Sequence, residues 1–519
     1  MKQIKFISLF KLFKDNVIQE SMISLDNSLE LSVLYRKLGW RVVRTIFTSA
    51  VKTQSRMRTM YNFFQYILSL RRIHGSEYVV QYLKLSQLTI QKCLANEKIS
   101  SMRELDSSFS FPRLTNSGLP SSIPLQDRRA IMNKTVPVIR FWLTLFSIYR
   151  IVKIPGKLKL QTITDPYTGS VEALGRVSDN LRVLSRKFSS RFPKAIAKKE
   201  MGISLIESSS PSSRVSWVTI FDSPLDLARS GLGQVALDYM LEMGYSKLLE
   251  QWVTIFRHFK IISKFVPFHD QPCVGTVGKA MKNVIIGKLS TKAEAAGKIR
   301  VFAMVDVWTQ SLLKPLHEAL FSFLKSLPND GTFDQTASWK RCAEKAKVSG
   351  CSYGYDLSAA TDRLPIQLQV AVLDSWIGPH AALLWKKLLV DRDYYLALTD
   401  KDGVKTNTPY RYSVGQPMGA LSSWAMLAVT HHLIVQLAYR QAYPYGKLDW
   451  YDNYELLGDD IILFDKLVAD CYLSIMDEIG VPINLAKSVV SANPTTEFAK
   501  VTTHFGNNVS ALSWKMFIS

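Results

Sequence analysis

Two adjacent aspartates interrupt an apolar segment in the last quarter of the sequence. The segment YELLGDDIILFD, residues 454–465, places Asp459 and Asp460 directly after Gly458, with apolar residues on both sides. Carboxylates repel each other, and their burial is costly unless a cation or hydrogen-bond donors compensate. The pattern predicts two strands joined by a tight turn at Gly458 and Asp459. A rigid hairpin tip of this kind can present carboxylates to a hard divalent cation.

A second acidic segment offers the further carboxylate that a two-metal site needs. YGYDLSAATDRLP places Asp356 at the end of a predicted strand and Asp362 six positions later. Taken alone, Asp356 is also typical of a solvated loop acid or a helix cap. If Asp356 lies beside Asp459 across the sheet, Asp356, Asp459 and Asp460 can bracket two Mg²⁺ ions about 3.5–4 Å apart. That geometry predicts nucleotidyl transfer, in which one ion activates a 3′-hydroxyl and the other neutralises the triphosphate.

A glycine-containing loop lies between these acids and runs into a predicted helix. Gly415 and Gly419 permit close approach of the backbone to a neighbouring group. Ser422 and Ser423 fall near the helix start, where hydroxyl groups and backbone N–H groups suit phosphate or ribose. Loops before helices often have this composition without binding a substrate, so the signal is weak alone.

Three basic residues flank the acids in the sequence. Lys298 and Arg300 are two positions apart, so on a predicted strand they project from the same face and can guide an incoming triphosphate. A basic edge strand is the common alternative for one such pair. Lys487 follows a predicted helix over residues 466–480 and is placed to give a proton to a leaving pyrophosphate. Its alternative is a solvent-facing lysine.

The net charge of +22 is unevenly distributed along the chain. Residues 1–200 contain 34 Lys and Arg against 13 Asp and Glu, whereas residues 201–519 contain 31 against 30. A basic first part beside a balanced second part suits a protein that binds a polyanion with one region and performs chemistry in the other. A merely soluble basic surface is the alternative. Apolar spacing predicts that residues 1 to about 110 are largely helical.

Composition excludes several other classes of protein. The 519 residues, 47% of them hydrophobic, predict two to four domain-sized units. Five scattered cysteines without a CxxC pair disfavour a disulfide framework or a zinc site. No apolar run reaches the length of about 18 residues that predicts a membrane span, and residues 141–149 and 423–439 are interpreted as core helices. The lysine-rich start, MKQIKFISLFKLFK, is typical of a mitochondrial presequence or of a first helix.

The order of these segments resembles a known family. Five segments follow the order of motifs F, A, B, C and D in viral RNA-dependent RNA polymerases. They are the KxR pair, the Asp356–Asp362 segment, the GQPMG loop, the GDD triplet and Lys487. Several segments resemble the replicases of mitoviruses, which are capsidless relatives of narnaviruses. These segments are RVFAMVDVWTQ, DLSAATDRLP, GQPMGALSSWAMLAVTHH, INLAKS and EFAK. The resemblance is clear over residues 290–515 and covers five motifs in sequence, which is far more specific than any single one.

This resemblance implies a mixed α/β (α+β) fold, the right-hand polymerase with fingers and palm and a helix-rich N-terminal region. It divides the chain into a basic, mainly helical N-terminal region or fingers extension at 1–200, fingers with motif F at 201–345, and a palm with motifs A to E at 346–519. It also implies a single-stranded RNA template, a nascent RNA, nucleoside triphosphate substrates, Mg²⁺ or Mn²⁺ as cofactor, and residence in a host mitochondrion.

The resemblance also implies a role for each motif residue. Asp356 and Asp459 would be metal ligands, with Asp460 as their neighbour, and Asp362 would contact the ribose 2′-hydroxyl. Lys298 and Arg300 would contact the triphosphate, and Lys487 would be the general acid. Motif B contacts would come from Ser422 or Ser423, in the loop of Gly415 and Gly419.

Two departures and two alternatives accompany the resemblance. Val501 stands where the family usually has arginine, and the chain stops at Ser519 where family members continue, which predicts a shortened thumb and raises the option of a C-terminal partner chain. A reverse transcriptase normally has an aromatic residue before its hairpin acids, where this chain has Leu457-Gly458. Asp362 can accept a ribose hydroxyl, which favours RNA synthesis. The other alternative is an inactive, host-captured remnant that only binds RNA, against which the three intact acids argue.

Overall fold

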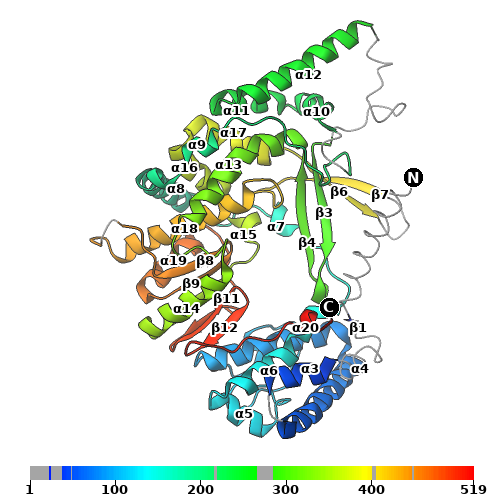
Figure 1. The fold of residues 1–519 in the computed structure, drawn as a ribbon, viewed down its shortest axis with the longest axis vertical. Helices are drawn as coiled ribbons and strands as arrows, with labels where there is room; N and C mark the ends of the chain where they lie inside the picture. The colour runs from blue at the N-terminus through cyan, green and yellow to red at the C-terminus, as the bar shows by residue number, and fades with distance from the viewer. Residues whose placement is uncertain are drawn as a thin grey trace.

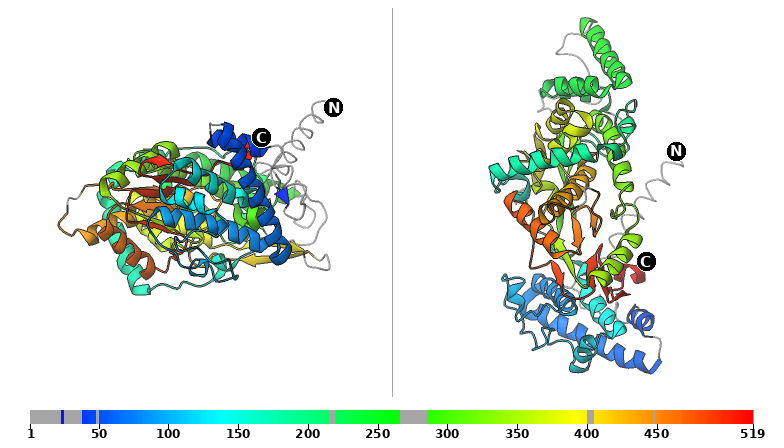
Figure 2. Two further views of the ribbon diagram at one scale, coloured as in Figure 1. Left: turned by 90° about the horizontal axis from the view of Figure 1, so that it is seen from below. Right: turned by 90° about the vertical axis from the view of Figure 1, so that its left-hand side faces the viewer.

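The computed structural model describes residues 23–24, 38–47, 50–214, 219–265, 285–399, 405–446 and 449–518. Figure 1 shows a helical unit from the N-terminal part at one end, a sheet with its covering helices in the middle, and a layer of helices at the other end. The views in Figure 2 agree on this elongated arrangement. The lysine-rich start, interpreted as a presequence or a first helix, lies outside the described residues.

The N-terminal unit is a small helical domain with its own core. Its elements are β1 (Ile23–Ser24), α3 (Trp40–Ile46), α4 (Ala50–Leu94, with a break at Gly75), η2 (Met102–Glu104), α5 (Leu125–Met132), α6 (Val136–Phe146), η3 (Ser147–Ile151) and β2 (Val152–Lys153). Phe63 of α4 meets Trp142 of α6 edge to face at 5.7 Å between ring centroids. The prediction of helix before residue 110 is confirmed for α3 and α4.

The C-terminal residues return to this N-terminal core. After β13, the chain runs past Val509 to α20 (Trp514–Ile518), and both Val509 and Trp514 are buried among the N-terminal helices. Trp514 Nε1 donates a hydrogen bond of 2.8 Å to the carbonyl oxygen of Thr144. Segments from opposite ends of the sequence therefore share one core, as Figure 1 shows where α20 lies beside α3 and α6.

The second and largest core joins the upper helices to the central sheet. The helices of this part are α7 (Gln161–Thr164), α8 (Val171–Lys187), η4 (Ser189–Arg191), α9 (Lys194–Ala197), α10 (Ser223–Arg229), α11 (Gly233–Met243), α12 (Ser246–Phe265), α13 (Val307–Lys325), α15 (Ala360–Arg363), α16 (Ile366–Ile377), α17 (Pro379–Val390), α18 (Ser423–Ala442) and α19 (Lys466–Glu478). In the described part of the chain, no helix is long and apolar enough to cross a membrane.

The two hydrophobic cores meet between residues 152 and 163. The N-terminal core reaches Val152, and the second core begins at Ile163, so that α8 packs on α16 of the central part. The limits at residues 200 and 345 stay predictions. The interpretation of residues 141–149 and 423–439 as core helices is confirmed, since α18 is buried along most of its length.

A four-stranded sheet of order β4-β3-β6-β7 stands to one side of the central part. Its strands are β3 (Gly287–Ala293), β4 (Ile299–Val305), β6 (Tyr394–Thr399) and β7 (Lys405–Tyr410), with the 3-10 turn η6 (Ala295–Gly297) between the first two. A fully buried ion pair fixes its base: Arg392 donates to Asp306 Oδ2 at 2.9 Å and to the Ile286 carbonyl oxygen at 3.0 Å. Asp306 also caps α13, so sheet and helix are held by one carboxylate.

The central sheet has the order β10-β5-β9-β8, with every neighbouring pair antiparallel. Its strands are β5 (Ser352–Asp356), β8 (Tyr454–Leu457), β9 (Asp460–Leu463) and β10 (Val489–Ser491). Ile461 and Leu463 pack in the large core, whereas Ile462 packs on the opposite face against α14 (Gln335–Ser349). Both faces are covered, which explains why β9 is apolar at successive positions.

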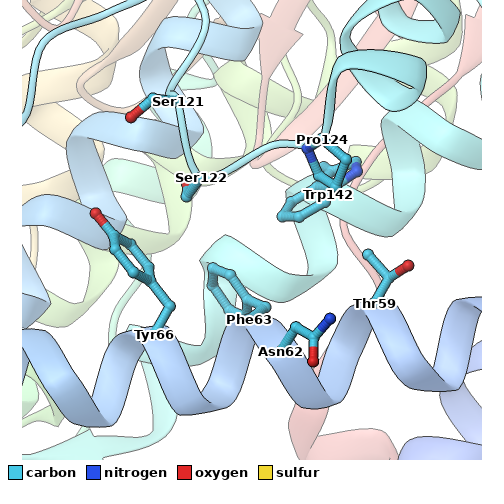
Figure 3. A pocket seen from close by; sticks show the side chains of 8 residues that line it. All are labelled: Thr59, Asn62, Phe63, Tyr66, Ser121, Ser122, Pro124 and Trp142. Carbon is cyan, nitrogen blue, oxygen red and sulfur yellow. The ribbon is translucent and has the colours of Figure 1, made fainter.

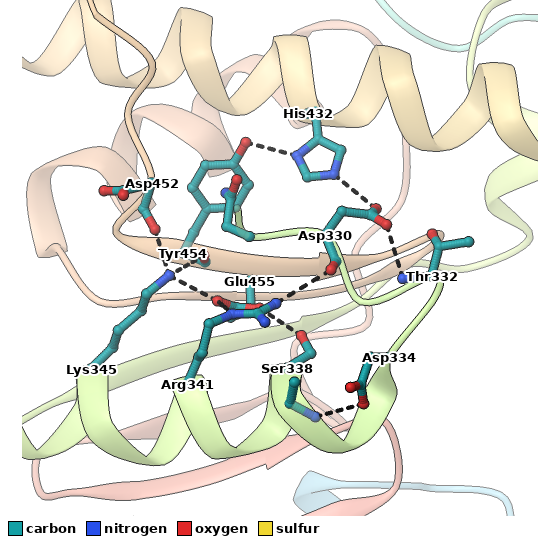
Figure 4. Close-up of polar contacts among 12 residues, drawn as sticks. Asp330, Thr332, Asp334, Ser338, Arg341, Lys345, His432, Asp452, Tyr454 and Glu455 are labelled. Carbon is teal, nitrogen blue, oxygen red and sulfur yellow. Dashed lines mark hydrogen bonds and ion pairs between the residues drawn. The ribbon is translucent and has the colours of Figure 1, made fainter. Parts of the chain in front are cut away.

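A third sheet and a buried ionic network complete the support of the hairpin. The sheet β11 (Thr495–Phe498), β12 (Val501–His504) and β13 (Asn507–Asn508) is antiparallel. In Figure 4, the fully buried Glu455 of β8 accepts hydrogen bonds from Arg341, Lys345 and Ser338 of α14, at 2.5 to 2.8 Å. The network binds α14 to the strand that leads into the two adjacent acids.

We expect Glu455→Gln to lower the free energy of unfolding by about 2–3 kcal/mol, because the buried carboxylate is lost and two cations lose their partner. Chemical unfolding followed by fluorescence measures this change. Glu344→Gln, on the exposed face of the same helix, is the matched control and should change stability by less than about 0.5 kcal/mol. Equal effects of the two substitutions would show that the network does not stabilise the hairpin.

Candidate active site

The predicted hairpin and its neighbouring acidic strand are both present in the structure. Strands β8 and β9 are joined by the two-residue turn Gly458-Asp459, as the sequence predicts. Asp356, the last residue of β5, pairs directly with Asp460, the first residue of β9. The direct partner of Asp356 is thus Asp460, and Asp459 lies one residue away in the turn. The carbonyl oxygen of Gly458 accepts a hydrogen bond of 2.8 Å from His431 of α18, which anchors the turn.

The electrostatics of this group follow from burial and from neighbouring charges. Burial raises the pKa of Asp356, and Asp459 raises it further, whereas Lys487 and Lys298 lower it. Burial also raises the pKa of Asp460 well above its usual range, with Glu497, Asp459 and Asp356 adding to the effect and a hydrogen bond from Ala499 opposing it. The carboxylates therefore act on one another, which is the signature of groups that share one site.

Glu497 is a fourth acid of the group that the sequence reasoning missed as a site residue. It lies on β11, and burial raises its pKa to about 7, with Arg150 opposing the shift and Asp356 adding to it. The available signal was the EFAK segment, where one acid interrupts an otherwise neutral strand. Arg150 belongs to the N-terminal unit, so this acid links the site to a residue far away in the sequence.

The carboxylates differ in what they can offer to a cation. Neither Asp356 nor Asp459 forms a hydrogen bond or ion pair through its carboxylate with a described residue. Asp460 commits Oδ2 to the backbone N–H of Ala499 at 2.8 Å. Within the described residues, no three acids, histidines or cysteines are grouped closely enough to hold a metal ion. The hard oxygen donors of Asp356 and Asp459 nevertheless fit a divalent cation by their chemistry.

The glycine loop packs against the protein's own backbone. A Cβ atom at Gly415 would lie 2.2 Å from the Thr361 carbonyl oxygen, and one at Gly419, where φ is +121°, would lie 2.3 Å from the Ala303 carbonyl oxygen. The Gly415 N–H donates to the Asp362 carbonyl oxygen at 3.0 Å. The loop therefore connects the Asp362 segment with β4, and both glycines are required by close approach.

Ser422 and Ser423 stand at the start of α18, as predicted, but both side chains face the interior. Ser422 Oγ accepts a hydrogen bond of 2.9 Å from Trp385, and its backbone N–H donates to His317. The Ser423 hydroxyl is buried and has no hydrogen-bond partner among the described residues. Their contact with a substrate stays a prediction, and in this conformation they fix the helix start.

The structure brings the predicted basic residues toward the acids. Lys298 was predicted to lie on the strand but comes one residue before β4. Its charge acts on Asp356. Lys487 also acts on Asp356 and is exposed. Arg300 lies on β4 and forms an ion pair of 3.0 Å with Glu294. The charges of Lys298 and Lys487 thus act on Asp356, whereas Arg300 is paired with Glu294.

Asp362 lies in the short helix α15, directly beneath the glycine loop. Its Oδ2 accepts a hydrogen bond of 2.8 Å from Thr162 Oγ1 of α7, a partner that the sequence reasoning did not identify. Burial raises the pKa of Asp362, while the bond from Thr162 and the charge of Arg363 lower it. One carboxylate oxygen is thus fixed by the protein, and the second makes no hydrogen bond to a described residue.

A cavity of about 320 Å³ lies in the N-terminal unit rather than at the acids. Figure 3 shows its lining, which α4 and the loop before α5 provide together with Trp142. Its residues are Thr59, Asn62, Phe63, Tyr66, Ser121, Ser122, Pro124 and Trp142. The lining contains no charged side chain and belongs to the separate N-terminal core, so the cavity is not part of the acidic site.

Paired acidic strands, a turn that exposes a carboxylate, and lysines from distant segments whose charges act on Asp356 are the arrangement expected of nucleic acid polymerases. A family model described as Mitovirus RNA-dependent RNA polymerase matches residues 196–519. The chain belongs to this family. The resemblance stated from the motifs is thereby confirmed, as is the mixed helix and strand composition.

Individual relatives agree with the family assignment. The RNA-directed RNA polymerase of Cryphonectria parasitica mitovirus 1 (strain American chestnut tree/New Jersey/NB631) is 30% identical over 443 residues, which are 82% of this chain and 50% of that protein. The chain thus spans about half the length of this relative. Two uncharacterized mitochondrial proteins of Arabidopsis thaliana are 37% and 30% identical over 34% and 32% of this chain, and over 69% and 78% of their own lengths.

We expect Gly415→Ala to lower the free energy of unfolding by about 2 kcal/mol or more, because the added methyl group overlaps the backbone of the Asp362 segment. Gly175→Ala is the matched control. It lies inside α8 with open space around it, so alanine should stabilise the protein by about 0.5–1 kcal/mol. Chemical unfolding curves measure both changes. A tolerated methyl group at residue 415 would contradict the tight contact.

Proposed function

We propose that this chain is an RNA-dependent RNA polymerase that copies a single-stranded RNA template by two-metal nucleotidyl transfer. The observation that carries the proposal is the pairing of Asp356 with Asp460 across β5 and β9, with Asp459 exposed in the adjoining turn. The family assignment and the mitovirus relative support the same reaction. The central sheet with α14, α18 and α19 would form the palm, and the β3–β4 sheet with the upper helices would form the fingers.

The side chains of the site divide the work of the reaction. Bound Mg²⁺ or Mn²⁺ would supply the positive charge that makes a 3′-hydroxyl nucleophilic and stabilises the departing pyrophosphate. Asp356 and Asp459 would hold the cations, with Asp460 as the third acid. Lys298 and Arg300 would orient the triphosphate, and Lys487 would give a proton to the leaving pyrophosphate oxygen.

RNA binding follows from the charge of the N-terminal part. The excess of basic residues in residues 1–200 suits contacts with the phosphates of template and product, which weaken as salt concentration rises. Mitochondrial residence in a host is part of the proposal, because the viral relative is a mitovirus protein and two plant relatives are mitochondrial proteins.

The role of Asp459, the acid in the hairpin turn, can be tested by substitution. Asp459→Asn should reduce incorporation of labelled ribonucleotide on a short RNA template with Mg²⁺ by at least about 100-fold, because a charged ligand is lost without a change of size. Asp452→Asn, an exposed acid shortly before β8, should leave the rate within about twofold of wild type. If wild-type protein binds RNA in a salt-dependent way but incorporates nothing, the chain is an RNA-binding remnant and the proposal fails.

The role of Asp362 in selecting ribonucleotides over deoxyribonucleotides can also be tested by substitution. Asp362→Ala should reduce the preference for ribonucleotides over deoxyribonucleotides about tenfold or more, because the free carboxylate oxygen can accept the 2′-hydroxyl. Thr162→Val removes only the bond that positions Asp362, so its effect should be smaller. The ratio of kcat/KM for the two sugars is the measurement. An unchanged ratio in Asp362→Ala would remove this residue from sugar selection, and a preference for deoxyribonucleotides in wild type would indicate a reverse transcriptase.

A further inference from the structure

A long helix of the N-terminal unit lies directly beside the acidic site. Helix α4 contacts η6, which immediately precedes Lys298, and β10, which begins two residues after Lys487. Lys84 belongs to this helix and is half-buried. The helix lies outside residues 196–519, the part matched by the family model.

The attachment of α4 to the site is fixed by buried hydrogen bonds. Lys92 Nζ, which is almost fully buried, donates to the Ser488 carbonyl oxygen at 2.9 Å, and the Ser488 hydroxyl accepts the backbone N–H of Asp356 at 3.2 Å. At the end of the helix, the Leu94 carbonyl oxygen accepts a bond of 2.8 Å from Asn493. One residue, Ser488, therefore connects α4 with the strand that ends in a site acid.

The N-terminal unit also packs against the turn before Lys298, which α4 contacts. Ala296 of η6 packs against the N-terminal core. A Cβ atom at Gly297 would lie 3.0 Å from the side chain of Ile154, which shows how closely the N-terminal unit meets this turn. Helix α4, which bears Lys84, therefore contacts the segments next to both Lys298 and Lys487.

The three lysines form a cluster of positive charge. Burial lowers the pKa of Lys84, and Lys487 and Lys298 lower it further, whereas Asp106 raises it. The ammonium groups of Lys84, Lys298 and Lys487 form no hydrogen bond or ion pair with any described residue; Lys84 lies 5.8 Å from the Tyr149 ring centroid. Like charges gathered in this way are unfavourable unless an anion compensates for them.

We propose that Lys84, together with Lys298 and Lys487, binds the polyphosphate of a nucleoside triphosphate opposite Asp356. The proposal rests on the proposed polymerase function and deepens it by assigning a substrate contact to the N-terminal unit. A triphosphate concentrates its charge on three adjacent phosphates, which matches three cations gathered at one place. The backbone of an RNA strand carries a single charge per nucleotide and matches a longer, spread basic surface better.

The test is equilibrium binding of ATP, AMP and a short single-stranded RNA to the full chain with Mg²⁺. Lys84→Ala should weaken ATP binding about tenfold, as expected for loss of one charge-assisted contact, and leave AMP and RNA binding within about twofold. Lys84→Arg should bind ATP nearly as well as wild type. Arg72→Ala, which removes an equal charge from an exposed position of α4 before its break at Gly75, should behave as wild type. Thermal unfolding midpoints establish that the variants are folded.

The outcomes separate this inference from the proposed function. Unchanged ATP binding in Lys84→Ala, in a protein whose wild type incorporates nucleotides, overturns the role of Lys84 and leaves the polymerase intact. Weaker RNA binding without weaker ATP binding also overturns it, because Lys84 would then contact the RNA backbone. Lys84-dependent ATP binding in a wild-type protein that incorporates nothing supports the triphosphate site and refutes the polymerase.

Discussion

The pairing of β5 with β9 is the constraint on which the rest of the site depends, because it holds Asp356 against Asp460 despite their repulsion. Backbone hydrogen bonds of an antiparallel ladder fix this register, and apolar side chains on both faces of β9 prevent it from slipping. The buried network around Glu455 adds a second restraint, since it joins the preceding strand to α14. The free energy that opposes the gathering of acids is thus offset by burial and bonding immediately behind them.

Hydrogen bonds also attach the N-terminal unit to the C-terminal strands near the site. Besides the bonds of Lys92 and Leu94, Gln91 of α4 donates to Thr502 of β12 at 2.9 Å, and Arg140 of α6 donates to the Asn508 carbonyl oxygen. Each bond joins residues separated by hundreds of positions in the sequence. The basic N-terminal unit is therefore attached to the strands beside the site, so its charged residues have a fixed position relative to the acids.

Local patterns predicted the parts of the site that depend on local structure. The hairpin and α19 follow from apolar periodicity and turn residues, and their positions are confirmed. The partners of these elements could not be predicted, because Thr162, Glu497 and Lys84 reach the site through tertiary packing that leaves no periodic signal. The inward-facing Ser422 shows the converse: a helix start predicts an exposed hydroxyl, but Trp385 of a distant helix covers it.

The charge balance at the hairpin explains why both signs are needed in one place. Asp356 and Asp459 repel each other, and Lys298, Lys487 and Lys84 do the same among themselves, while each set lowers the electrostatic cost of the other. A divalent cation relieves the acids, and a polyphosphate relieves the lysines. On the proposed function, a metal-bound nucleoside triphosphate would carry both partners at once, so that its binding would compensate both sets of charges. The separation of charge in the free protein would then be a form of preorganisation toward that substrate.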